Sequence, residues 1–188
     1  MGAPLQGDLA VVTPSIASFI RTIPDHPKPG ILFRDVSGLL EDPLGLGLAV
    51  DRITDHYMSS SIDFLAAIEA RGFIFGAAVA YNLGVGFLPL RKKGKLPGEV
   101  IGVDYELEYG SDRLEIQTQR MQPGARVLLV DDLIATGGTA DAAIELIHQS
   151  GGYVHSACFV IDLPDLGGSE RIRSRGCDVF SLCQFDGH

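Results

Sequence analysis

The segment 127–139, V-L-L-V-D-D-L-I-A-T-G-G-T, constrains the fold of this chain more than any other. Its four leading apolar residues predict a strand buried on both faces, which is typical of a parallel sheet covered by helices. The strand runs into two adjacent acids, then a loop of small residues, and then a predicted helix from about Thr139. This order indicates an α/β fold with a ligand site at the carboxyl end of the sheet.

The loop after this strand is suited to binding phosphate. Its glycines let the backbone turn its N–H groups inward, and free N–H groups at a helix N-terminus bind phosphate. No lysine follows the glycines and the spacing is not GxGxxG, so a Walker loop and a dinucleotide fingerprint are excluded. A terminal monophosphate is favoured, with these candidate ligands: Ala135, Thr136, Gly137, Gly138 and Thr139.

Asp131 and Asp132 point to a sugar ligand. Successive strand residues face opposite sides, so the two carboxylates diverge and do not form one compact metal clamp. They can instead hold neighbouring hydroxyls of a sugar from two directions. The plain alternative is a β–α turn with helix-capping threonines, but two acids at the end of a core strand are costly without partners.

The rest of the chain alternates between predicted strands and helices. The proline-rich stretch 24–30 excludes regular structure, and two alternating runs joined by residues 110–112 predict an antiparallel hairpin over 100–118. Strands are predicted at 62–68, 85–90, 126–130, 153–161 and 178–183, and helices at 13–22 with Thr13 as N-cap, about 42–58, 72–82 and about 139–149. We therefore expect one α/β domain over 1–188, with a mainly parallel sheet of roughly five strands flanked by helices. A small N-terminal hood segment, 1–36, precedes it.

Composition excludes several classes of function. The 15 Lys and Arg against 24 Asp and Glu give a net charge of −9, which argues against broad nucleic-acid binding. An apolar content of 46% excludes a disordered chain, and no membrane span or secretory signal is visible. The cysteines, Cys158, Cys177 and Cys183, lack metal-ligand spacing and predict reduced cytosolic thiols.

Two further basic features are candidate anion sites. Arg71 follows a predicted strand, and its planar guanidinium suits pyrophosphate oxygens. The alternative is an ion pair with Glu69 or with another surface acid. The dense cluster Arg91, Lys92, Lys93 and Lys95 is either a local diphosphate site or a solvated loop.

The segment 127–139 resembles the 5-phosphoribosyl 1-pyrophosphate (PRPP) motif of the type I phosphoribosyltransferases. The chain also contains PGILFRD, EARGFIF, LRKKGKLPG and LEYG, at 29–35, 69–75, 90–98 and 107–110. Together these segments resemble the adenine phosphoribosyltransferase family from about residue 23 to 140. The resemblance implies the reaction adenine + PRPP ⇌ AMP + pyrophosphate, a purine salvage step, in a cytoplasmic homodimer. It also implies Mg²⁺ held by PRPP and pyrophosphate oxygens and waters rather than by a protein-only metal site.

The resemblance assigns roles to residues. Asp131 and Asp132 bind the ribose hydroxyls, the loop 135–139 binds the 5′-phosphate, and Arg71 binds pyrophosphate. The hairpin 100–118 becomes a mobile lid that excludes water from the sugar centre. The remaining roles are Glu108 as general acid/base, Tyr109 near the leaving pyrophosphate, Lys95 on phosphate, and Arg91 reaching the neighbouring subunit's site.

Base recognition falls to residues 31–34 in this resemblance. Phe33 can stack on adenine, the backbone around Leu32 can read its ring edge, and Arg34 can donate to a ring nitrogen. The family also has a non-proline cis peptide in the loop before Arg71, with Glu69–Ala70 as the candidate here.

The chain departs from the family in two places. Glu69-Ala70 stands where eukaryotic members have Asp-Ser, which removes a hydroxyl near pyrophosphate, and residues from 162 onward resemble the family only loosely. Three alternatives follow. One is the same transfer to hypoxanthine, guanine or xanthine. The second is a non-catalytic PRPP-sensing regulator, which would need a DNA-binding lobe or basic face. The third is a binding module without turnover, which would lack Arg71 or the lid acid.

Overall fold

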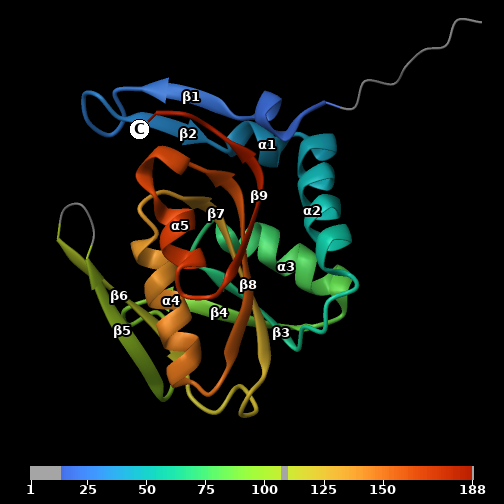
Figure 1. The fold of residues 1–188 in the computed structure, drawn as a ribbon, viewed down its shortest axis with the longest axis vertical. Helices are drawn as coiled ribbons and strands as arrows, with labels where there is room; N and C mark the ends of the chain where they lie inside the picture. The colour runs from blue at the N-terminus through green and yellow to red at the C-terminus, as the bar shows by residue number, and fades with distance from the viewer. Residues whose placement is uncertain (1–13, 107–109, 188) are drawn as a thin grey trace, which may run out of the picture.

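The computed structural model describes residues 14–106 and 110–187, and its centre is a mainly parallel β-sheet (Figure 1). Within these ranges the sheet has the strand order β5-β6-β4-β3-β7-β8-β9. Neighbouring strands from β4 to β9 pair in parallel, and β6 joins the edge of β4 in antiparallel orientation. The bounds are β3 (Phe64–Ile68), β4 (Gly86–Lys92), β5 (Val100–Glu106), β6 (Ser111–Gln117), β7 (Arg126–Ile134), β8 (Tyr153–Asp162) and β9 (Asp178–Gln184). The predicted α/β class and the antiparallel hairpin are confirmed.

Helices cover both faces of this sheet (Figure 1). One face carries α4 and α5, and the other carries α2 and α3. The bounds are η1 (Ile16–Phe19), α1 (Ser37–Glu41), α2 (Pro43–Tyr57), α3 (Gly72–Leu83), α4 (Gly138–Gln149), η2 (Pro164–Leu166) and α5 (Gly168–Arg173). The predicted helices at 42–58, 72–82 and 139–149 agree with α2, α3 and α4 to within two residues.

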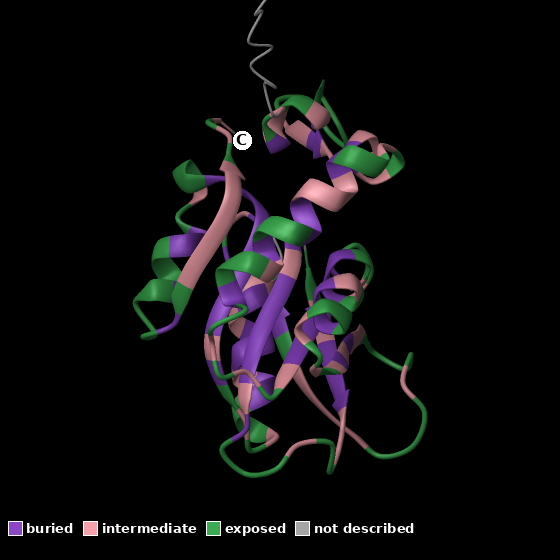
Figure 2. Ribbon diagram, turned by 90° about the vertical axis from the view of Figure 1, so that its right-hand side faces the viewer, coloured by how far each residue is buried: buried purple, intermediate pink, exposed green. Residues whose placement is uncertain are grey.

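Alternation along the strands divides the core between the two faces. In β7, Val127 and Leu129 pack with α4, whereas Leu128 and Val130 pack with α2 and α3. All four are fully buried, which explains why the run has no polar residue. Figure 2 shows the same result, with a buried central sheet and exposed outer turns. The carboxyl end of β7 is therefore held rigidly between two packed layers.

The described part of the hood is a small, separate sheet. Its strands β1 (Arg21–Pro24) and β2 (Leu32–Asp35) pair antiparallel. The predicted helix over 13–22 is wrong: only Ile16–Phe19 form a 3₁₀ turn, capped by Ser15, and Thr13 lies outside the described residues. Pro24 cannot continue a helix and biases its predecessor to extended backbone. The chain therefore pairs with β2 across the turn.

Three further differences from the prediction bear on the site. Strand β7 continues through both acids to Ile134, because residues 131–134 pair with Phe159–Asp162 of β8. The helices α1 and α5 and the turn η2 were not predicted. The hairpin 100–118 is also part of the main sheet, since Arg91 and Lys92 of β4 pair with Glu115 and Leu114 of β6. No helix in the described ranges is long and apolar enough to cross a membrane.

Candidate active site

A cavity of about 310 Å³ opens where β3, β4 and β7 end. Chain segments that are distant in the sequence meet here because the carboxyl ends of parallel strands share one edge of a sheet. Its lining is Ile68, Glu69, Ala70, Arg71, Lys92, Tyr105, Asp131, Asp132, Leu133 and Thr139. The structure thus brings together Arg71, both predicted ribose acids and Thr139, the last residue of the predicted phosphate loop.

A smaller pocket of about 150 Å³ adjoins this cavity and shares Asp131, Leu133 and Thr139 with it. It is formed by residues 133–140 together with Asp131 and Phe159. Helix α4 begins here without a side-chain cap, whereas Asp42 caps α2 by accepting hydrogen bonds from Leu44 and Gly45. The first N–H groups of α4 are therefore open to an anion, and the helix dipole favours one.

The shape of the phosphate loop depends on Gly168, a residue that sequence reasoning missed. Its N–H donates to the carbonyl of Ala135 at 3.0 Å, and a Cβ on Gly168 would lie 2.2 Å from that oxygen. Gly137, at φ +79°, would likewise meet the backbone of Gly168 at 3.0 Å. The backbone of residues 135–137 and that of Gly168 lie so close together that only glycine fits between them. The Gly-Gly pair at 167–168 was the available signal.

The two acids at the end of β7 occupy different positions. Asp131 lines both pockets, and Asp132 lines only the larger one, where its Oδ2 lies 2.7 Å from Nε of Arg71. Burial raises the pKa of both carboxyls, and the charge of Asp132 raises that of Asp131 further. Arg71 opposes this for Asp132. A pair of carboxylates with one cation beside it is well suited to accept hydrogen bonds from sugar hydroxyls.

Glu69 binds Arg91 rather than Arg71. The Arg91 guanidinium donates to both carboxylate oxygens at 3.1 Å, and the N–H of Lys92 adds a third bond at 3.0 Å. These bonds hold the pKa of Glu69 below its usual range. The Glu69–Ala70 peptide is cis, as the resemblance implied. In this chain Arg91 is therefore paired, while the Lys95 side chain is exposed and its carbonyl accepts a bond from Arg91 at 2.9 Å.

Lys92 and Tyr105 line the cavity: Lys92 was predicted only as part of the basic cluster, and Tyr105 was not predicted as a site residue. Lys92 Nζ lies 2.8 Å from Oδ2 of Asp112, and this bond raises the pKa of Lys92 and lowers that of Asp112. The Tyr105 hydroxyl lies 3.4 Å from the same oxygen. The position of Lys92 beyond a predicted strand end was a usable signal. The place of Tyr105 depends on how the hairpin packs on α4.

The hood reaches the cavity through Phe33. The Arg71 guanidinium lies 5.7 Å from the centre of the Phe33 ring, and the His26 ring meets Phe33 edge-on at 5.0 Å. Leu32 precedes Phe33 on β2 and is half-buried. The side chain of Arg34 does not line the cavity. It is buried and donates to the Thr22 hydroxyl and the Asp186 carbonyl. Its Nε is also buried and has no hydrogen-bond partner among the described residues, and donation from Arg34 to the base stays a prediction.

Two other features complete the surroundings. Glu108 and Tyr109, the predicted catalytic residues of the lid, lie outside the described residues.

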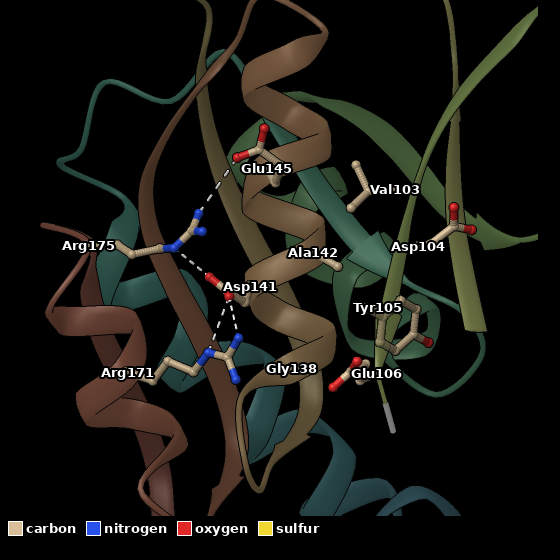
Figure 3. Close-up of a pocket in the computed structure, with 10 residues that line it drawn as sticks. All are labelled: Val103, Asp104, Tyr105, Glu106, Gly138, Asp141, Ala142, Glu145, Arg171 and Arg175. Atoms are coloured by element: carbon tan, nitrogen blue, oxygen red, sulfur yellow. Dashed lines mark hydrogen bonds and ion pairs between the residues drawn. The ribbon is translucent and has the colours of Figure 1, made fainter. Parts of the chain in front are cut away.

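A separate pocket of about 340 Å³ lies between β5 and α4 (Figure 3). There Arg171 and Arg175 reach Asp141 on α4, each at 2.5 Å. This pocket meets the candidate active site only at Tyr105 and Gly138, and it contains neither Arg71 nor the two acids of β7.

Comparison with known proteins gives a consistent result. The sequence model of the phosphoribosyl transferase domain matches residues 42–186. The chain is 60% identical over 173 residues to an adenine phosphoribosyltransferase from Nitrosospira multiformis, covering 92% of this chain and 99% of that one.

Solved structures agree with the sequence match. The adenine phosphoribosyltransferase from Thermoanaerobacter pseudethanolicus superposes with a TM-score of 0.85 at 46% identity, covering 90% of this chain and 98% of that one. The enzyme of the same name from Saccharomyces cerevisiae, complexed with an imino-altritol bisphosphate and adenine, superposes with a TM-score of 0.83 at 38% identity, covering 89% and 96%.

Proposed function

The chain belongs to the adenine phosphoribosyltransferase family, and we propose that it transfers the 5-phosphoribosyl group of PRPP to adenine, giving AMP and pyrophosphate in purine salvage. One observation carries this function. Arg71, Asp131 and Asp132 line a single cavity beside an uncapped helix N-terminus, and an aromatic side chain of the hood lies next to Arg71. Each part of PRPP, and the base, then has a matching group.

Substrate binding follows from the chemistry of these groups. The 5′-phosphate accepts hydrogen bonds from the N–H groups of the loop 135–139, and the ribose hydroxyls donate to Asp131 and Asp132. The pyrophosphate lies against Arg71 and Lys92, the cations of this cavity lining. These contacts hold the ribose anomeric carbon, whose bond to pyrophosphate breaks, inside the cavity.

Catalysis in this site is mainly positioning and charge stabilisation. As the bond from the ribose anomeric carbon to pyrophosphate breaks, positive charge builds on the sugar and negative charge on the leaving group. Arg71 and Lys92 stabilise the leaving oxygens, and the aspartates keep the ribose in place. Adenine stacks on Phe33 of the hood and attacks the same carbon through N9 of its imidazole ring, and the proton that the base loses passes to the proposed general base, Glu108.

Mg²⁺ fits this site as an ion carried by the substrate. The cavity lining holds three carboxylates, of which Glu69 is paired with Arg91, while Asp131 and Asp132 are the proposed ribose ligands. Mg²⁺ prefers oxygen ligands and keeps several waters, so PRPP and pyrophosphate oxygens are its expected ligands. When bound, the ion neutralises charge on the leaving pyrophosphate.

The lid supplies the remaining groups. Glu108 is proposed as the general acid/base and Tyr109 as a hydroxyl near the leaving pyrophosphate. Closure of the hairpin 100–118 would exclude water and prevent hydrolysis of PRPP. The variant Glu108→Gln keeps the shape of the side chain and removes its charge, so a loss of kcat is expected. Unchanged turnover would contradict the acid/base role.

The proposal extends to assembly and location. Residues 1–188 are proposed to form one catalytic domain that works as a cytoplasmic homodimer. Two large apolar side chains of α3, Ile74 and Tyr81, are 45% and 86% exposed and support a subunit contact on that helix. The free thiols of Cys158, Cys177 and Cys183 suit a reducing compartment. Light scattering of wild type and Tyr81→Glu tests the dimer, since only the variant should be monomeric.

The test of the reaction is a PRPP- and Mg²⁺-dependent assay with adenine, hypoxanthine, guanine and xanthine offered separately. Chromatography identifies the nucleotide formed. We expect AMP from adenine and no product from the oxopurines. Product from an oxopurine would keep the PRPP site and contradict the base assignment, and no product from any base with PRPP bound would favour the regulator.

A further inference from the structure

The C-terminal segment Phe185–Gly187, here called the tail, joins the hood to the main sheet. Figure 1 shows the C-terminus lying beside β2, although the two are about 150 residues apart in the sequence. A Cβ added to Gly187 would lie 3.4 Å from Cδ1 of Leu32, so Gly187 lies next to this residue of β2. The tail therefore lies against the strand that carries the base-binding side chains.

Arg34 is the centre of this contact. The residue is 8% exposed, and a buried guanidinium must find hydrogen-bond acceptors. One acceptor is the Thr22 hydroxyl on β1, and the other is the Asp186 carbonyl of the tail. The Phe185 ring lies 4.7 Å below the guanidinium carbon. Without the tail, Arg34 would lose one acceptor and its aromatic cover.

The same residues of the tail also bind the main domain through their backbone N–H groups. The N–H of Phe185 donates to the carbonyl of Asp162, the last residue of β8, at 3.1 Å. The N–H of Gly187 donates to Oδ2 of Asp165 in η2 at 2.8 Å. The tail is thus fixed to the same sheet end that carries the candidate active site.

The hood needs such an anchor. Every residue of β1 is exposed, and the buried side chains that tie the hairpin to the core, Ile20 and Val36, flank only its open end. A two-stranded hairpin has little stability of its own. Phe33 and Arg34 are neighbours on β2, so their side chains leave the strand on opposite faces. Phe33 meets Arg71 of the cavity on one face, while Arg34 meets the tail on the other.

We propose that the tail is a positioning element for the purine base: by holding Arg34 it fixes β2, and with it Phe33, over the cavity. Phe185 and the Asp186 carbonyl touch no reacting atom and act through Arg34. The tail therefore sets affinity for the base and leaves affinity for the phosphate and ribose unchanged. This inference rests on the proposed function, since it concerns the base half of the same site.

The test separates base affinity from phosphate affinity with two ligands. AMP carries base, ribose and phosphate, whereas ribose 5-phosphate lacks the base. In Phe185→Leu, which keeps apolar volume and removes the ring, we expect the AMP Kd to rise about tenfold, as for one lost interaction with a charged group. The Kd of ribose 5-phosphate and the KM of PRPP should stay within about twofold. The KM of adenine should rise with the AMP Kd.

Three further variants of the protein serve as controls for this comparison. Phe185→Tyr keeps the ring and should retain wild-type affinity for AMP. Asp186→Ala keeps the backbone carbonyl and removes an exposed side chain, so it should also behave as wild type. Deletion of residues 185–188 should produce a larger loss of AMP affinity than Phe185→Leu. If the truncated chain does not fold, the three full-length variants decide the question.

Two results would overturn the proposal. One is an unchanged AMP Kd in Phe185→Leu, and the other is an equal loss of affinity for AMP and ribose 5-phosphate. Failure of the proposed function is a different outcome, because wild-type protein would then make no AMP from adenine and PRPP. If the wild-type protein forms AMP but the KM of adenine is the same in Phe185→Leu, only the proposed role of the tail is contradicted.

Discussion

The two halves of the candidate active site are built differently. The phosphate and ribose half comes from one continuous segment, in which β7, the loop 135–137 and α4 follow one another. The base half is assembled from β2, the loop that carries Arg71, and the tail, which are far apart in the sequence. The first half is held between two packed layers, and the second rests on a few contacts between exposed elements. Substitutions should therefore affect the halves separately.

The largest effect is expected at Asp132. Asp132→Asn removes the charge beside Arg71, at 2.7 Å, and an acceptor for a ribose hydroxyl. We expect kcat/KM for PRPP to fall about 10²–10³-fold, because the lost interactions involve charged groups in the cavity. Steady-state kinetics measures this change, with Asp51→Asn on the exposed face of α2 as the control. A change in the KM of adenine alone, with kcat/KM for PRPP unchanged, would contradict the division into two halves.

Gly168 tests whether the phosphate loop is as rigid as its packing implies. Gly168→Ala would place a Cβ 2.2 Å from the Ala135 carbonyl oxygen, so the loop or α5 must move. We expect the free energy of unfolding to fall by about 1–3 kcal/mol, together with the affinity for ribose 5-phosphate. Urea denaturation and calorimetry measure these.

The matched control for this change is Gly47→Ala. Nothing lies within 4 Å of a Cβ at Gly47, which is inside α2. Replacing a helix-interior glycine by alanine should raise stability by about 1 kcal/mol. If Gly168→Ala behaved like Gly47→Ala, the loop would not depend on close backbone approach.

Phe33 tests the base half. Phe33→Leu keeps an apolar side chain but removes the aromatic face that lies 5.7 Å from Arg71. The KM of adenine should rise about tenfold, since stacking of a base on an aromatic side chain contributes about 1–3 kcal/mol. The KM of PRPP should change little. An equal change in both constants would show that the halves are coupled, and Tyr153→Leu at an exposed aromatic position serves as control.

The smallest effect concerns Glu69 and is visible as a pH dependence. Its pKa is lowered in the folded protein by Arg91, so its contribution to stability is present above the unfolded-state pKa and is lost as pH falls through the folded-state pKa. Glu69→Gln should cost about 1 kcal/mol near neutral pH. The stability difference between variant and wild type should begin to shrink as pH falls below ~4.3, where an unfolded Glu titrates, and should vanish below the folded-state pKa. A difference that persists there would mean that packing, not charge, stabilises this side chain.

Several parts of the molecule could be predicted because their signal is local. The apolar run of β7 and the glycines after it place a strand, a turn and a helix without reference to any other segment. The acids 131–132 follow directly, and Arg71 and the hairpin 100–118 are located by strand ends and alternation. The predicted helix 13–22 is wrong because a strand partner and Pro24 outweigh a short amphipathic spacing.

What the sequence by itself determined is the parallel α/β layering, the strand–loop–helix order of residues 126–149 and the family. These depend on the period of apolar residues and on short motifs, which each segment carries within itself. Only the tertiary structure decided that Arg91 pairs with Glu69, that Gly168 shapes the phosphate loop and that Arg34 faces the tail. The physical reason is that a charged or close-packed group takes whichever partner the fold places within reach, and chain spacing does not encode that partner.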